Sequence, residues 1–89
     1  MMMPRMIKPI DRKAIGYRIA SLRASDDWSQ EEFANIFKAN KSIVSKWERG
    51  IHLPSIDRLR KMGRIFNVTL EWLLYGEGER DGRSILDKN

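Results

Sequence analysis

Five side chains that can donate hydrogen bonds recur within a short segment in the middle of the chain. If residues 41–49 form a helix, all five project away from Val44 and Trp47, and three of them carry a positive charge. They are Lys41, Ser42, Ser45, Lys46 and Arg49. A short helix that is apolar on one side and donor-rich on the other is what the major groove of DNA accepts. The alternative interpretation is a solvated surface, which an isolated Lys/Ser face would favour.

The segment before this helix carries the signals of a second helix. Ser29 is a good N-cap, and Glu32 three residues later completes a capping box. Trp28 can pack on Phe33 as a hydrophobic staple. The apolar face of this helix consists of Phe33, Ala34 and Phe37.

A tight turn must join the two helices. Lys38 and Ala39 leave no room for a longer loop, and Asn40 is a suitable cap for the helix over residues 41–49. Gly50 supplies a left-handed residue that ends it. Because the donor-rich face follows a capped helix and a tight turn, the sequence favours DNA binding over a merely solvated surface.

Residues 29–50 resemble the helix-turn-helix of the Cro and lambda-repressor type, in the xenobiotic-response-element family of regulators. The resemblance extends from about Ile15 to Gly78. Its most specific parts are Gln30, Ala34, residues 47–50 (WERG), Pro54 and residues 72–78 (WLLYGEG). It implies an all-α, compact five-helix DNA-binding domain over residues 11–76, with the motif at residues 29–50.

The chain departs from the family pattern in the turn, where Lys38 stands in place of the usual glycine. A left-handed lysine is strained by about 1 kcal/mol. This departure lowers stability slightly and leaves the assignment in place.

The resemblance also implies roles for individual residues. Base edges would be contacted by Lys41, Ser42 and Lys46, and since lysine pairs with the O6 and N7 acceptors of guanine, we expect guanine at one or two steps of the half-site. Contacts to the DNA backbone or to flanking bases would come from Gln30, Asn40, Ser45 and Arg49. In this family an arginine near the end of the first helix often pairs with the glutamate after the tryptophan, which predicts a structural salt bridge between Arg23 and Glu48.

Three further helices are predicted around the motif. Asp11 caps a helix over residues 12–24, whose buried stripe is Ile15, Ile19 and Leu22. After Pro54, a helix begins at Ser55, and its apolar stripe is Ile56, Leu59, Met62 and Phe66. Within it, Gly63 implies close packing against a neighbour. Residues 70–75 form the last helix; residues 1–10 are expected to be a flexible arm and residues 77–89 a flexible tail.

Composition limits the chain to one small basic domain. It has 89 residues, with 17 lysines and arginines against 12 aspartates and glutamates, and a formal charge of +5. This balance favours a polyanionic partner. Cysteine is absent, which excludes disulfides and thiolate metal sites and makes a cytoplasmic location the default expectation. Residues 1–10 are too short and too broken by proline for a signal peptide or a membrane span.

The sequence contains no pairing of residues that can be nominated for catalysis or cofactor binding. His52 is the single histidine, so the sequence contains no pair of histidines for a metal site. The glycines at 76, 78 and 82 are not followed by the Gly-Lys-Ser/Thr of a nucleotide loop. We therefore expect no enzyme, no metal and no cofactor.

The last predicted helix has more apolar side chains than one core-facing side can use. If Trp72 and Leu73 face the core, Leu70 and Leu74 lie on another side and are candidates for a homodimer interface. Two copies could read the half-sites of a palindromic operator as a transcriptional repressor. The alternatives are an antitoxin or adaptor-type protein-interaction module that uses the same fold and, third, a nucleoid-like coating protein.

Overall fold

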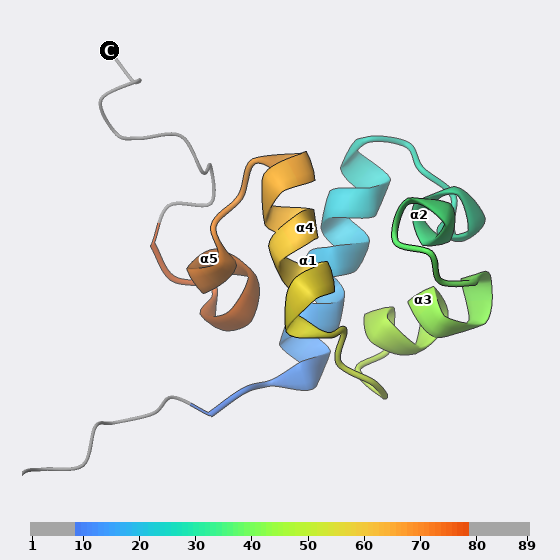
Figure 1. Ribbon diagram of the computed structural model, residues 1–89. Coiled ribbons are helices and arrows are strands. Elements are labelled where there is room, and N and C mark those ends of the chain that lie inside the picture. The colour runs from blue at the N-terminus through green and yellow to red at the C-terminus, as the bar shows by residue number, and fades with distance from the viewer. Residues whose placement is uncertain (1–8, 79–89) are drawn as a thin grey trace, which may run out of the picture.

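The computed structural model describes residues 9–78, and this part of the chain contains five α-helices. They are α1 (Arg12–Ser25), α2 (Gln30–Ile36), α3 (Lys41–Glu48), α4 (Ile56–Phe66) and α5 (Leu70–Tyr75). In Figure 1, α1 and α4 run through the middle of the molecule, α2 and α3 lie on one side of them, and α5 lies on the other. The predicted all-α, five-helix fold is confirmed.

Each helix is preceded by a cap residue, whose side chain accepts a hydrogen bond from a backbone N–H in the first turn of that helix. The cap residues are Asp11, Ser29, Asn40, Ser55 and Thr69. At α2 the capping box is complete, because Ser29 Oγ accepts from the Glu32 N–H at 3.0 Å and Glu32 Oε1 accepts from the Ser29 N–H at 2.8 Å. These local bonds explain why helix starts could be predicted from the sequence.

The core is formed by all five helices and includes contacts between aromatic rings. Phe33 of α2 stacks on Phe66 of α4 with ring centroids 5.8 Å apart, and Phe37 meets the Trp47 ring edge-on at 6.2 Å. The buried apolar side chains are Ile15, Ile19, Leu22, Phe33, Ala34, Phe37, Val44, Trp47, Leu59, Met62, Val68 and Leu73. The helix that carries the donors is therefore anchored in the core by its apolar side.

Glycine allows two close backbone approaches, one between α1 and the end of α3 and one between α4 and the segment that follows it. A Cβ built on Gly16 of α1 would lie 2.6 Å from the Glu48 carbonyl oxygen, at the end of α3. A Cβ on Gly63 of α4 would lie 2.9 Å from the Val68 carbonyl oxygen, which agrees with the close packing expected at this glycine. The first approach sets how closely α3 crosses α1.

The predicted arm and tail fall mostly outside the described residues. Of the arm only Pro9 and Ile10 are described, and of the tail only Glu77 and Gly78, so both remain predictions. Within residues 9–78 no helix is long and apolar enough to cross a membrane. The same residues contain no cluster of three or more His, Cys, Asp or Glu side chains that could hold a metal ion.

Candidate nucleic-acid interface

Helix α3 presents the predicted donor-rich face. Its anchor residues Val44 and Trp47 are 0% and 2% exposed, respectively. On the other side, Lys41, Ser42 and Arg49 are exposed, whereas Ser45 and Lys46 are half-buried. The exposed part of this face is therefore densest at the N-terminal end of α3, which is the end that enters the major groove in helix-turn-helix proteins.

Three of the expected backbone-contacting residues also serve the local structure. Asn40 Oδ1 accepts from the Ile43 N–H at 2.9 Å, which leaves its amide N–H groups for another partner. Ser45 Oγ accepts from Arg49 Nε at 3.2 Å, so these two side chains lie together; Arg49 is the C-cap of α3, which ends one residue earlier than predicted. Each therefore has donors left for DNA, and its orientation is limited by the helix.

Gln30, at the start of α2, is held by the end of α3. Its Nε2 donates to Glu48 Oε1 at 3.0 Å, and no other hydrogen bond of this side chain occurs within residues 9–78. The expectation of a phosphate contact from Gln30 thus rests on its second amide hydrogen and on its backbone N–H. No local pattern predicts this link between α2 and α3, since the two residues are 18 positions apart.

Arg23 and Glu48 form an ion pair that joins α1 to α3. Arg23 Nε donates to Glu48 Oε2 at 2.6 Å and Arg23 Nη2 donates to Glu48 Oε1 at 3.2 Å, a two-pronged arrangement. Arg23 Nη1 also donates to the Trp28 carbonyl oxygen at 2.8 Å. The hydrogen bond to Glu48 raises the pKa of Arg23 above its ordinary value, against a smaller opposing effect of burial. This network ties together α1, the segment before α2 and the end of α3.

A depression beside α3 adds further cations that the sequence did not single out. It has a volume of about 480 Å³, and it lies against the connector between α3 and α4. Arg12 and Arg58 line it together with His52 of the connector. Arg12 is exposed at the start of α1, so this edge of the candidate interface is also basic.

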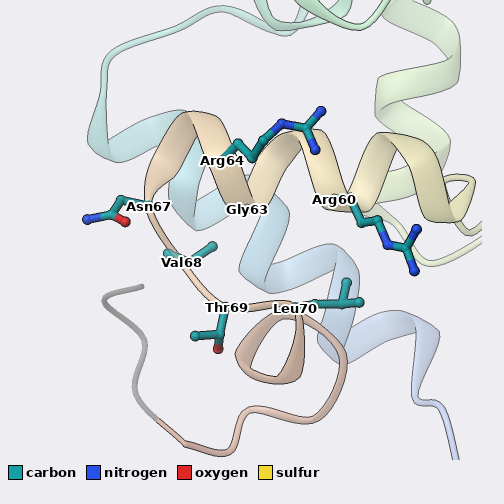
Figure 2. Close-up of a pocket in the computed structure, with 7 residues that line it drawn as sticks. All are labelled: Arg60, Gly63, Arg64, Asn67, Val68, Thr69 and Leu70. Carbon is teal, nitrogen blue, oxygen red and sulfur yellow. The ribbon is translucent and has the colours of Figure 1, made fainter. Parts of the chain in front are cut away.

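A second basic groove lies between α4 and α5. Figure 2 shows its lining residues: Arg60, Gly63, Arg64, Asn67, Val68, Thr69 and Leu70. The two arginines leave α4 in different directions, Arg60 toward Leu70 and Arg64 away from it (Figure 2). They do not converge on one point, as a site for a single anion would require.

The two leucines proposed for a dimer interface are each partly used by the chain itself. Leu70 and Leu74 are half-buried and pack against the core. Leu70 also lines the groove of Figure 2, while Leu74 lines a different depression with Arg18 and Tyr75. Part of each leucine remains accessible, and the homodimer stays a prediction.

Together the fold and this face define a helix-turn-helix DNA-binding domain. A family model described as Helix-turn-helix matches residues 19–73. The chain belongs to this helix-turn-helix family. The family is one of non-enzymatic DNA-binding regulators, which confirms the expectation that the chain is not an enzyme.

Relatives and solved structures agree with this family. Over 76 residues the chain is 32% identical to the HTH-type transcriptional activator BcrR of Enterococcus faecalis, covering 80% of this chain and 37% of that protein. Over 74 residues it is 27% identical to the HTH-type transcriptional regulator DicA of Escherichia coli (strain K12), covering 83% of this chain and 55% of DicA. The chain thus spans from about a third to about half of the length of these curated relatives.

Two solved structures share the fold. The hypothetical transcription factor NHTF from Neisseria superposes with a TM-score of 0.61 at 24% identity, over 79% of this chain and 86% of that one. The DNA-binding domain of BldD gives a TM-score of 0.58 at 20% identity, over 71% of this chain and 92% of that one. At these identities the likeness supports the fold.

Proposed function

We propose that this chain is a sequence-specific transcriptional regulator that reads double-stranded DNA with α3. The observation that carries the proposal is the exposed, donor-rich side of α3, whose opposite side is buried through Val44 and Trp47. Base edges are contacted by Lys41, Ser42 and Lys46, and lysine selects guanine at one or two steps of each half-site. With DNA as the partner, the protein works in the cytoplasm.

The surrounding residues position α3 by binding the DNA backbone. Gln30 contacts a phosphate from the start of α2, and Asn40, Ser45 and Arg49 contact phosphates or flanking bases around α3. The phosphate contacts among these are the same on every sequence, so they provide affinity and register, while the lysines provide most of the specificity.

The protein acts as a homodimer on a palindromic operator. A single module of this size buries about 600–1,000 Å² on DNA, which is small for tight specific binding. Two copies related by a two-fold axis read half-sites about 34 Å apart and so double the contact area. The accessible parts of Leu70 and Leu74 provide apolar surface for the contact between copies. Occupation of the operator represses transcription by excluding other proteins from the same DNA.

Selection of binding sites from a random DNA pool tests this proposal. We expect an enriched motif with two guanine-containing half-sites in inverted orientation, whose centres are about one helical turn apart. Enrichment of a single half-site would refute the dimer while leaving recognition by α3 standing. Recovery of no motif at all would refute sequence-specific binding and favour the protein-interaction alternative.

A further inference from the structure

The turn between α2 and α3 leaves three backbone carbonyl groups that backbone donors do not satisfy. The N–H groups of Phe37 and Ala39 both donate to the Ala34 carbonyl oxygen, at 3.0 and 2.9 Å. The Lys38 N–H donates to the carbonyl oxygen of Asn35 at 3.4 Å. Within residues 9–78 no backbone N–H bonds the carbonyls of residues 36, 37 and 38. Such groups at a helix end need partners from elsewhere.

Helix α4 supplies all three partners from two side chains. Lys61 Nζ donates to the Ile36 carbonyl oxygen at 2.8 Å. Arg58 donates twice, from Nε to the Phe37 carbonyl oxygen at 3.1 Å and from Nη2 to the Lys38 carbonyl oxygen at 3.2 Å. Two cations therefore cap the end of α2, where the helix dipole favours positive charge.

The same two cations also contact the aromatic rings of the motif. The Arg58 guanidinium lies over the Trp47 ring of α3, 5.5 Å from its centroid. Lys61 Nζ lies 5.7 Å from the centroid of the Phe37 ring. Arg58 thus touches both the turn and the buried side of α3. Because these contacts join α4 to both the turn and α3, they limit the direction in which α3 leaves the turn.

The two cations donate hydrogen bonds to a turn in which Lys38 stands where the family pattern usually has glycine. Lys38 has a φ of 55°, which is the left-handed conformation expected for it. A lysine does not prefer this conformation, so the turn relies on contacts outside itself to remain in place. The other two cations of α4, Arg60 and Arg64, are exposed and have no hydrogen bond or ion pair with the described residues.

We propose that Arg58 and Lys61 are positioning residues for DNA recognition. They hold the strained Lys38 turn and thereby fix the orientation of α3, replacing with long-range hydrogen bonds what glycine supplies locally. This inference rests on the proposed role of α3 as the helix that reads the bases. It assigns no DNA contact to either cation.

The test compares Arg58→Met and Lys61→Met with Arg60→Met, a control that removes the same charge from the same helix. The quantity measured is the ratio of the dissociation constants for a shuffled duplex and for the operator selected by the unmodified protein. Both duplexes carry the same phosphates, so a loss of charge alone lowers both affinities and leaves the ratio unchanged. We expect the ratio to fall about tenfold for Arg58→Met, several-fold for Lys61→Met and not at all for Arg60→Met.

Rescue by Lys38→Gly separates this role from general support of the fold. Glycine adopts the left-handed conformation without strain, so Lys38→Gly in the Arg58→Met background should return the ratio to within about twofold of the original. The proposal is overturned if Lys38→Gly changes the ratio equally with and without Arg58. It is also overturned if Arg58→Met leaves the ratio unchanged.

Hydrogen exchange of the Ala39 N–H tests the turn without DNA. This group is bonded inside the turn, and we expect it to exchange faster in Arg58→Met while the amides of α1 keep their protection. If the Ala39 N–H exchanges faster in Arg58→Met but the unmodified protein does not discriminate between the two duplexes, recognition by α3 is refuted. The dependence of the turn on Arg58 is then still supported. If Arg58→Met leaves the exchange rate of the Ala39 N–H unchanged while the unmodified protein discriminates between the two duplexes, the positioning role is refuted and recognition by α3 is not. If Arg58→Met does not fold, both measurements are made on Lys61→Met, which removes one hydrogen bond to the turn instead of two.

Discussion

Glu48, at the end of α3, joins α3 to two other helices through its carboxylate. Its carboxylate accepts from Arg23 of α1 and from Gln30 of α2, and its side chain is only 9% exposed. A carboxylate so little exposed is costly unless it is fully bonded, and here three donor nitrogens surround it. Glu48 therefore orients a side chain of the proposed DNA surface while belonging to the scaffold itself.

Lys46→Ala and Gln30→Ala should weaken DNA binding in different ways. Loss of the lysine removes a base contact, worth about 1–3 kcal/mol of discrimination, so base preference should relax at one step of the half-site. Loss of Gln30 removes a backbone contact, so affinity should fall by a similar factor on all sequences. Binding measured on the operator and on its single-base variants distinguishes the two effects. Equal losses across all sequences for both variants would show that the assigned roles are wrong.

Arg23→Ala should destabilise the fold by about 2 kcal/mol, because it removes hydrogen bonds to a little-exposed carboxylate. The pKa of Arg23 is raised in the folded state, so its contribution is fully present below the unfolded-state pKa and is lost only as pH rises through the folded-state pKa. The difference in free energy of unfolding between the two proteins should therefore be the same at pH 7 and pH 9. Urea denaturation at both values measures it, and a difference that shrinks by pH 9 would contradict this account.

For single residues, the sequence predicts the hydrogen bonds that join groups only a few positions apart in the chain. The caps at Asp11, Ser29 and Asn40 each bond a backbone N–H three residues later, and each was expected from the sequence. The bond from Gln30 to Glu48 and those from Arg58 to the turn join residues 18 to 21 positions apart. Their existence depends on how the helices cross, which no local pattern contains.

At the scale of the helices, the crossing of α1 and α3 determines how firmly the recognition helix is held. Gly16 lies where α1 meets the carbonyl groups of Trp47 and Glu48. This contact could not be predicted from the sequence, because a glycine inside a predicted helix is locally unfavourable and its partner is remote. The apolar stripes, by contrast, predicted α1 to α4, since burial follows the helical period, although Ile56 of the predicted α4 stripe is exposed.

Gly16→Ala should destabilise the protein although alanine is the better helix former. The new methyl group would overlap two backbone carbonyls that cannot move aside separately, and overpacking of this kind costs about 1–3 kcal/mol. The midpoint of thermal unfolding and operator affinity should both fall. Ser21→Ala, at an exposed position of the same helix, is the matched control and should change stability by no more than about 0.5 kcal/mol. A Gly16→Ala protein as stable as the control would contradict the close crossing.

At the scale of the whole molecule, charge and fold support the same partner. The chain carries a net charge of +5, and the basic edge formed by Arg12 and Arg58 adjoins α3. Charge alone would suit any polyanion, whereas the helix-turn-helix specifies duplex DNA. A contact between two copies would use only the accessible parts of Leu70 and Leu74, because both residues also pack against the core.

Binding should weaken steeply with salt and should require two chains per operator. Each phosphate contact releases counterions, so a plot of log affinity against log salt should slope by about −0.9 per contact. Analytical ultracentrifugation of the complex should give two chains on a full operator and one on an isolated half-site. A slope near zero would favour a protein-interaction module over a DNA-binding regulator. One chain on the full operator would refute the dimer.

Methylation interference on the selected operator tests most directly that α3 reads the major groove. Dimethyl sulfate methylates guanine N7, the acceptor to which a lysine of α3 donates in this account. We predict that methylation of the half-site guanines blocks binding by the unmodified protein, and that Lys46→Ala abolishes the interference at one of these guanines. Binding that tolerates methylation at every half-site guanine, or an interference pattern that Lys41→Ala and Lys46→Ala both leave unchanged, would contradict recognition of bases by α3.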